Sequence, residues 1–292
     1  MLSNVKALMR EANKKKYALP ALNMGSLESL QGIIQAAEKM RSPVIVQTSG
    51  GEYKHFGADL VVDLVTFFAK KASVLVAMHL DHGHSFEDVK TAVKAGYTSV
   101  HIDGSALSHD ENIKLTRKVV NYCRPRGIFV EGEIGHVAGT SVPFKNIKAE
   151  TMAKQNVFTD PDEAQAFVKA TGVNTLAVTF GNAHGVFSAA PKLDFDLLKK
   201  IVKKVPVPIV LHGGSGIRPV DFKKAIKLGV RKVNMNTYLR MAYHDTLHKM
   251  VCKKKDVFKP YDILPPVINE IAKVAGKHME IFGSAGKIKT RK

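Results

Sequence analysis

The sequence has no tryptophan and only two cysteines, and these shortages exclude several classes of protein. Cys123 and Cys252 cannot build a disulfide framework, and they do not have the short spacing of a cysteine metal motif. No apolar run approaches the ~18 residues that a membrane-spanning helix needs. Charged residues interrupt the first ten positions too often for a secretory signal. We therefore expect a cytoplasmic protein with reduced thiols and no membrane association.

Acidic residues are also few beside basic ones, with 26 Asp and Glu against 44 Lys and Arg in 292 residues, a formal charge of +18. Such an excess of positive charge can favour binding to nucleic acid, to an anionic surface or to anionic small molecules. The lysines form short runs at 14–16 and 253–255 and a basic tail at 286–292, without the interleaved aromatic residues that stack on bases. This distribution favours a solvated lysine-rich surface, with nucleic acid only as a non-specific secondary partner.

The pattern of hydrophobic residues predicts the fold, because short apolar runs alternate with amphipathic stretches along the chain. Strands are predicted at residues 17–24, 43–49, 74–82, 98–104, 128–135, 175–181, 208–213 and 232–237. Helices are predicted at residues 26–41, 58–71, 85–96, 109–124, 160–172, 195–205, 220–229, 237–255 and 265–282. Residues 136 to about 157 are expected to form an irregular, mobile loop.

Eight strand–helix units in about 240 residues favour a closed barrel over an open doubly wound sheet. The first strand is not followed by the Gly-x-Gly-x-x-Gly run of a dinucleotide-binding fold, which supports the same choice. The sequence therefore predicts an α/β protein with a single (β/α)8 barrel, or TIM barrel, over residues 1–292 and an extra helix near its C-terminus.

The active sites of such barrels lie at the carboxyl ends of the strands, and polar residues gather there in this sequence. Five predicted strands carry them at or near their ends: His79-Leu-Asp81-His82-Gly-His84, Glu131-Gly-Glu133, Gly181-Asn182-Ala-His184-Gly185, His212-Gly213-Gly214-Ser215-Gly216 and Asn234-Met-Asn236-Thr237. Three histidines on three strand ends, His82, His184 and His212, can bind Zn²⁺ and leave one position for substrate. The histidines left without a function lie on predicted helices or loops: His55, His109, His244, His248 and His278.

Two of these segments follow strands seven and eight, where barrels often bind phosphate. The glycines of the 213–216 run let backbone N–H groups approach phosphate oxygens, and Ser215 and Thr237 add hydroxyl donors. A phosphorylated substrate also gives the positive charge of the chain a simple role.

Taken together, these motifs match those of a known family. The chain resembles the class II, metal-dependent fructose-bisphosphate aldolases, in the short-chain branch shared with tagatose-bisphosphate aldolases. The resemblance runs from residue 21 to residue 284. Its most specific segments are His79-Leu-Asp-His-Gly83, Ile102-Asp-Gly-Ser105, Val130-Glu-Gly-Glu133, Ala183-His-Gly185, Leu211-His-Gly-Gly214 and Val233-Asn-Met-Asn-Thr237.

The resemblance implies a reversible cleavage of fructose 1,6-bisphosphate to dihydroxyacetone phosphate and glyceraldehyde 3-phosphate, a step of glycolysis and gluconeogenesis. It implies one catalytic Zn²⁺ on the three histidines, with Glu131 near an alternative position of the metal. Asp81 corresponds to the general acid and base at the C4 oxygen. The implied substrate contacts are Asn23, Ser49, Gly185, Gly213, Ser215, Asn234, Asn236, Thr237 and Arg240, the last for the second phosphate. A monovalent cation (Na⁺ or K⁺) and a homodimer or homotetramer are also implied.

The chain departs from the family in the loop after the fifth strand. Related enzymes carry a glutamate there that moves the C3 proton of dihydroxyacetone phosphate, whereas this chain has Ser141. Glu150 is the only acid between His136 and Thr159, so we predict that it substitutes as the base. The alternatives are a different proton route or a protein of weak catalysis that binds or regulates.

The resemblance leaves the identity of the substrate sugar open between fructose 1,6-bisphosphate and tagatose 1,6-bisphosphate. Asn236 occupies a position where asparagine is found in fructose-type members and alanine is more usual in tagatose-type ones. With Arg240 supporting a bisphosphate, we favour fructose 1,6-bisphosphate and keep tagatose 1,6-bisphosphate as the alternative. The two sugars differ only in configuration at C4, so small shifts of polar contacts decide between them.

Overall fold

The computed structural model describes residues 2–144, 146–149, 151, 154–155, 157–253 and 256–288. Its central strands are β1 (Leu19–Asn23), β2 (Val44–Ser49), β3 (Val76–Gly83), β4 (Ser99–Ile102), β5 (Phe129–Ile134), β7 (Thr175–Val178), β9 (Ile209–Leu211) and β10 (Val230–Met235). They form a closed parallel barrel in the order β1-β10-β9-β7-β5-β4-β3-β2. The barrel closes where Leu19 of β1 lies opposite Lys232 of β10. The predicted eight-stranded barrel is confirmed.

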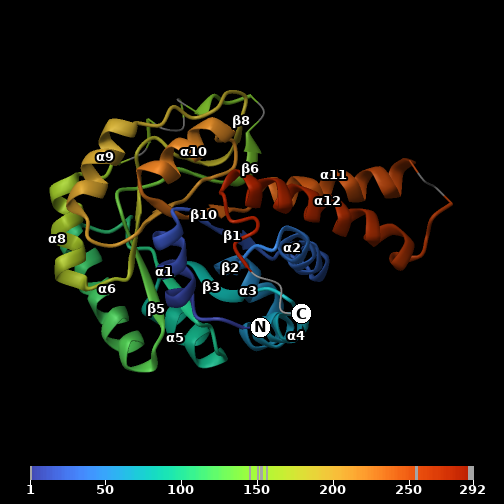
Figure 1. The fold of residues 1–292 in the computed structure, drawn as a ribbon, viewed down its shortest axis with the longest axis horizontal. Coiled ribbons are helices and arrows are strands. Elements are labelled where there is room, and N and C mark those ends of the chain that lie inside the picture. Colours follow the sequence, from blue (N-terminus) through green and yellow to red (C-terminus); the bar gives the residue numbers. More distant parts are fainter. Residues whose placement is uncertain are drawn as a thin grey trace.

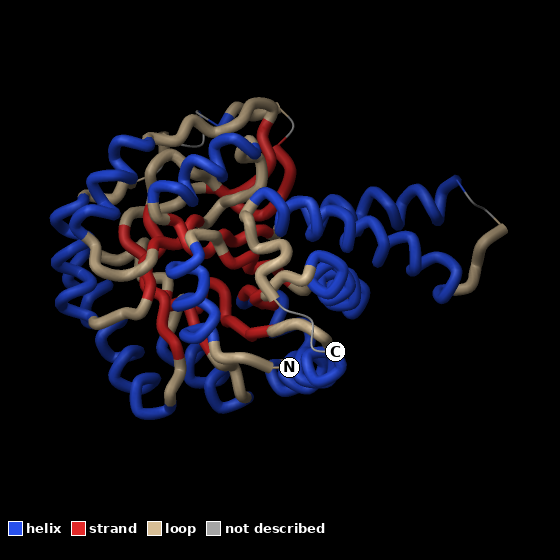
Figure 2. The backbone as a smooth tube through the Cα atoms, viewed as in Figure 1, coloured by secondary structure: helices blue, strands red, loops and turns tan. Residues whose placement is uncertain are grey.

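Helices surround this barrel, as Figures 1 and 2 show. They are α1 (Val5–Lys15), α2 (Leu27–Met40), α3 (Gly50–Phe56), α4 (Ala58–Lys71), α5 (Phe86–Ala95), α6 (His109–Cys123), α8 (Pro161–Thr171), α9 (Phe195–Lys204), α10 (Pro219–Leu228), α11 (Thr237–Lys253) and α12 (Pro260–Ile281), with a 3-10 turn at Arg124–Arg126. The predicted extra C-terminal helix is α12, which packs against α2 and α11. Helices α11 and α12 project from the barrel as a pair (Figure 1).

Serine residues begin several of these helices, as the sequence indicates. Ser26 and Ser85 accept hydrogen bonds from the backbone N–H groups of Ser29 and Asp88, which satisfies donors at the start of α2 and α5. The turns that lead from β1 into α2 and from β3 into α5 are therefore short and defined, and they fix the ends of these two strands at the mouth.

Helix α1, which the hydrophobic pattern did not predict, closes the amino-terminal end of the barrel. Its apolar side chains, Val5, Leu8, Met9 and Ala12, are buried against residues from the strands, among them Ile45 and Phe129. Lys6, Arg10 and Glu11 separate these apolar positions, and this charge concealed the helical period of the apolar residues. The bottom of the barrel is thereby covered, and the mouth at the opposite end holds the cleft.

Two further predictions need correction. The last helix begins at Pro260 instead of residue 265, because prolines 265 and 266 lie inside it. The 136–157 region contains a strand, β6 (Gly139–Phe144), which pairs in parallel with β8 (His184–Phe187) outside the barrel. The rings of Phe144 and Phe187 stack 5.4 Å apart at the end of this pair. Cross-strand contacts of this kind join two loops that are irregular when each is considered alone.

Candidate active site

Three histidines from three strands meet at the mouth of the barrel. The ring of His82 lies 4.7 Å from that of His212 and 5.2 Å from that of His184, measured between centroids. The Nε2 atom of His82 is 3.0 Å from Nδ1 of His212. His82 has a left-handed backbone (φ 52°), an uncommon conformation for a residue other than glycine that is found at functional sites. The three predicted metal ligands are therefore brought together.

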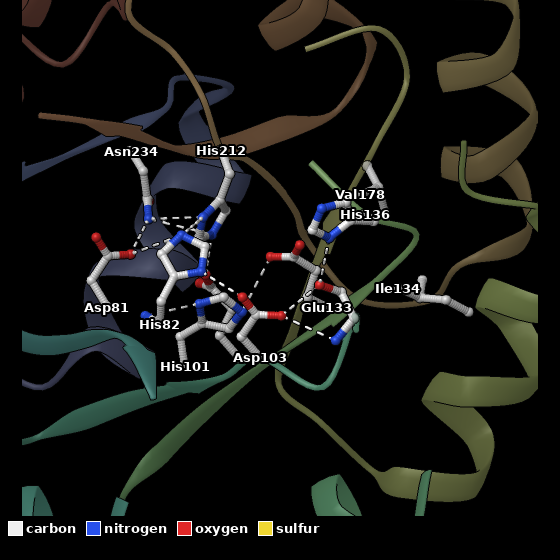
Figure 3. Close-up of polar contacts among 12 residues, drawn as sticks. Asp81, His82, His101, Asp103, Glu133, Ile134, His136, Val178, His212 and Asn234 are labelled. Carbon is white, nitrogen blue, oxygen red and sulfur yellow. Dashed lines mark hydrogen bonds and ion pairs between the residues drawn. The ribbon is translucent and has the colours of Figure 1, made fainter. Parts of the chain in front are cut away.

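A carboxylate orients the ring of His82, as Figure 3 shows. Asp103, directly after β4, accepts a hydrogen bond from Nδ1 of His82 at 2.8 Å, which aims Nε2 of the same ring at the centre of the cluster. Asp103 is fixed in turn by the backbone N–H and the hydroxyl group of Ser105. A second acid, Glu133, lies with His82 and Asp103 in a group whose candidate ligand atoms are all within 4.8 Å of one another.

Asp81 is held beside the histidines by two amide donors. The side chains of Asn23 and Asn234 donate to its two carboxylate oxygens at 3.1 and 2.9 Å. Burial alone would raise the pKa of Asp81, but the positive charge of His82 and the neighbouring His212 hold it well below its usual range. Asp81 is therefore an ionised acceptor aimed into the cleft, which is the state that a general base requires.

The histidines differ in protonation. Burial lowers the pKa of His184 to about 4 and, together with the charge on His82, holds that of His212 well below its usual range. Burial would also lower the pKa of His82, yet the negative charge of Asp81 and the hydrogen bond to Asp103 raise it to about 10. The pKa values of the three rings are therefore shifted in opposite directions, upward for His82 and downward for His184 and His212.

A separate set of charged groups lies one step deeper in the barrel. We call His79, Glu131 and Lys232 the lower layer, and Asp81, Glu133 and Asn234, two residues further along the same strands, the upper layer. In the lower layer, Lys232 donates to both oxygens of Glu131 at 3.1 and 2.9 Å and lies 3.3 Å from His79.

Glu131 therefore belongs to this lower layer and does not line the cleft. The carboxylate also accepts a hydrogen bond from the hydroxyl group of Thr175 at 3.5 Å and lies 2.8 Å from Nε2 of His212, which thereby joins the two layers. Its predicted place near an alternative metal position stays a prediction, while Glu133 and Asp103 lie closer to His82.

The segment after β9 forms a turn that only glycine can make. Gly213 has φ +64°, and a Cβ atom there would lie 2.5 Å from the backbone of Ala183. Gly213 and Ser215 face the cleft together with Thr237, the first residue of α11. Backbone N–H groups at a helix N-terminus and a glycine turn are suited to binding phosphate oxygens.

The β6 strand covers one side of this mouth. The N–H group of His184 donates to the carbonyl of Ala138 at 2.8 Å, so the loop is fastened to a predicted metal ligand. Arg240 on α11 donates from NH1 to the carbonyl of Ser141, at the position where the family glutamate is absent. Glu150, the predicted substitute base, lies outside the described residues.

A cleft of about 350 Å³ holds most of the predicted site residues. Those lining it are Asn23, Ser49, Asp81, His82, His184, Gly185, Gly213, Ser215, Asn234, Asn236, Thr237 and Arg240. Sequence reasoning gave no role to Asp103, Glu133 or His136, which line the same cleft, or to Glu52, which lies beside it. Asp103 follows a barrel strand directly, and Glu133 repeats Glu131 at the two-residue period of a strand, so both signals were present in the sequence.

The donor set at the mouth fits a divalent cation. Asp81, His82, His101 and His212 offer nitrogen and carboxylate atoms within 4.8 Å of one another, and His184 lies beside them. Nε2 of buried His101 and Oε2 of buried Glu133 lie 3.4 Å apart, and within the described part of the chain neither atom has a well-formed hydrogen bond. Imidazole and carboxylate ligands with orienting carboxylates behind them suit zinc and similar ions. The fold and the site together define a barrel enzyme with a candidate metal centre.

Comparison with known proteins identifies the family. Residues 3–287 match the family model described as fructose-bisphosphate aldolase class-II. A fructose-bisphosphate aldolase from Geobacillus stearothermophilus is 38% identical over 290 residues, covering 98% of this chain and 98% of that protein. This chain belongs to the class II fructose-bisphosphate aldolase family and is an aldolase, a carbon–carbon lyase.

Solved structures agree with this assignment. The YdjI aldolase from Escherichia coli K12 superposes with a TM-score of 0.84 at 33% identity, covering 99% of this chain and 100% of that one. The fructose-bisphosphate aldolase from Campylobacter jejuni has the same TM-score, 0.84, at 22% identity, covering 98% and 97% of the two chains, and this likeness shows the fold alone. Among the described residues, no helix combines the length and apolar character needed to cross a membrane.

Proposed function

We propose that this aldolase reversibly cleaves fructose 1,6-bisphosphate to dihydroxyacetone phosphate and glyceraldehyde 3-phosphate, a reaction of glycolysis and gluconeogenesis. The observation that carries the proposal is the convergence of three histidines and ionised Asp81 beside a glycine turn and a helix N-terminus. One part of this cleft is suited to a metal and a proton transfer, and the adjoining part is suited to a phosphate.

His82, His184 and His212 would hold the divalent cation, which we propose to be Zn²⁺. When bound, the ion supplies Lewis-acid polarisation of the substrate carbonyl and so stabilises negative charge on the carbon that loses its bond. Asp103 and Glu133, with His82, provide an alternative set of ligands at the cleft.

Asp81 takes the proton from the C4 hydroxyl group during cleavage and returns it during condensation. Its two amide donors fix the direction of the carboxylate, and its lowered pKa keeps it ionised until the substrate delivers the proton. Such a positioned group contributes typically 10²- to 10⁴-fold in rate.

The phosphate of the dihydroxyacetone half would bind to Gly213, Ser215 and Thr237, where the positive end of α11 meets the glycine turn. Arg240, one turn further along α11, would take the second phosphate. The excess of lysine in the chain favours the approach of a substrate that carries two phosphate groups.

Several finer features of the proposal come from the resemblance to the family. They are a monovalent cation beside the first phosphate, a homodimer or homotetramer, a preference for the fructose over the tagatose sugar through Asn236, and proton transfer at C3 by Glu150. Since Ser141 stands at the usual position of that base, slow proton exchange at C3 is the main competing expectation.

A coupled assay of triose phosphate release tests the proposal. We expect turnover of fructose 1,6-bisphosphate that exceeds turnover of tagatose 1,6-bisphosphate, disappears after exhaustive chelation and returns with Zn²⁺. A protein that retains full activity without metal would contradict the metal assignment. A folded, metal-loaded protein that cleaves neither sugar would instead point to a binding or regulatory role.

A further inference from the structure

Glu52 is a buried acid that the proposed mechanism does not use. It lies on α3, is 8% exposed, and lines a second cavity of about 440 Å³ next to the catalytic cleft. The two cavities share Asn23, Asn236 and Arg240, so the cleft continues into this second space. Glu52 therefore stands at the boundary between them.

The carboxylate of Glu52 joins several residues of the cleft. Its Oε2 atom accepts hydrogen bonds from the side chain of Asn23 at 2.9 Å and from the backbone N–H of Ser49 at 2.7 Å. Its Oε1 atom accepts from the side chain of Asn236 at 3.2 Å and from Arg240 at 2.9 Å. An ionised carboxylate has about four acceptor sites, so these donors use its capacity fully.

Arg240 depends on this carboxylate for its position. Its side chain is 46% exposed, and one guanidinium nitrogen donates to Glu52 while the other donates to the carbonyl of Ser141 at 3.2 Å. Two anchors on different nitrogens fix the plane of the guanidinium, and they leave further N–H groups of its five free to face an anion. A long side chain that is already ordered loses less conformational freedom when a ligand binds.

We propose that Glu52 is a positioning residue that sets the preference for a second phosphate by holding Arg240 at the boundary of the two cavities. The inference rests on the proposed function, which supplies a substrate with a phosphate on its aldehyde half. Because four donors surround the carboxylate, its charge is compensated before the substrate arrives. The ion pair thus presents an oriented cation to the second phosphate of the substrate.

A double-mutant cycle with two substrates tests this role. Fructose 1,6-bisphosphate is compared with fructose 1-phosphate, which lacks the second phosphate, in Glu52→Gln, Arg240→Met and the double variant. We expect Glu52→Gln to lower the ratio of the two kcat/KM values about tenfold, mainly through KM for the bisphosphate. In the Arg240→Met background the same substitution should leave the ratio unchanged, because Glu52 acts through Arg240.

General damage to the cleft cancels in the ratio of the two kcat/KM values, because Asn23 and Asn236 are expected to contact both substrates. Glu28→Gln is the matched control: Glu28 influences the pKa of Tyr243, another residue of the second cavity, and is not among the hydrogen-bond partners of Arg240. It removes one negative charge near that cavity, and the ratio should stay at the wild-type value.

Equal losses for both substrates in Glu52→Gln, or an effect on the ratio that persists without Arg240, would overturn the proposal. Calorimetry also measures the dissociation constants of the same two sugar phosphates, and this measurement does not depend on turnover. A wild type that binds both but cleaves neither would reject the proposed function, while the ratio of dissociation constants would still decide the role of Glu52.

Discussion

The lower and upper layers of the barrel place acids and nitrogen groups on the same three strands, yet their environments differ. In the lower layer, Lys232 and Glu131 are both 1% exposed and neutralise each other through two hydrogen bonds. In the upper layer, by contrast, Oδ1 of Asn234 is buried without a hydrogen-bond partner among the described residues, and Oε2 of Glu133 has only a 3.4 Å contact with Nε2 of His101. The lower layer is internally satisfied, and the upper layer keeps polar atoms ready for a ligand.

The acids of the two layers also titrate differently. Burial would raise the pKa of Glu131, but Lys232 and neighbouring histidines lower it. In the upper layer, burial and the charge of Asp103 raise the pKa of Glu133 well above its usual range, while that of Asp81 is lowered by the histidines. Two nearby acids with pKa values pushed in opposite directions are typical of a catalytic centre. Buried charged residues alone therefore do not identify the site, since both layers contain them. The upper layer is distinguished by polar atoms that are incompletely paired and by acids whose pKa values are shifted in opposite directions.

Removal of a histidine from the mouth gives the largest expected effect. His212→Ala should abolish turnover and lower the bound metal to background, because three protein ligands are the usual minimum at a catalytic zinc site. Atomic emission spectroscopy measures the bound metal, and the coupled assay measures turnover. His109→Ala on α6, outside the cleft, is the control. Full activity in His212→Ala after exhaustive chelation would contradict the metal centre.

Asp81→Asn should leave the metal in place and lower cleavage by about 10²- to 10⁴-fold, since it removes a proton acceptor while keeping the shape of the side chain. Metal content, the dissociation constant of the substrate and kcat separate these properties. A loss below about tenfold would assign the proton transfer to another group. Far-ultraviolet circular dichroism of the variant establishes that the comparison is made between folded proteins.

The sequence could predict roles for Asp81 and Asn234 of the upper layer because they lie near the ends of their strands, but it could not predict how the lower layer is paired. His79 and Lys232 lie in the middle of apolar runs, where the two-residue period places them inside the barrel without identifying their partners. Their pairing joins β3, β5 and β10, and strands so distant in the chain are brought together only by barrel closure. Likewise, the pairing of β6 with β8 could not be predicted, because it depends on two loops that meet at the mouth.

Lys232→Met tests the lower layer through stability. The substitution leaves the buried carboxylate of Glu131 without its cation, and breaking a buried pair in this way costs about 3–5 kcal/mol. Urea unfolding followed by circular dichroism measures the free energy of unfolding. Lys273→Met, which affects an exposed pair with Glu270, should change the free energy by less than about 1 kcal/mol.

The double variant Lys232→Met/Glu131→Gln sharpens the same test. Because neutral replacement of both partners of a buried pair is often tolerated, it should recover most of the stability that Lys232→Met loses. Equal stability of the single and double variants would show that the carboxylate carries no unpaired charge once the lysine is gone.

Asp103→Asn gives the smallest expected effect, because Asp103 acts on the centre by orienting a histidine. The substitution weakens the 2.8 Å hydrogen bond from Nδ1 of His82 and removes one of the charges that raise the pKa of that ring. Loss of such an orienting carboxylate typically lowers metal affinity or activity by 10- to 100-fold. Competition with a chromophoric chelator measures the affinity, and an assay at saturating metal should restore most of the turnover. Ser105→Ala, which removes only the hydroxyl group that holds Asp103, should give a smaller loss in the same direction. Unchanged metal affinity in Asp103→Asn would mean that His82 is oriented by its backbone turn alone.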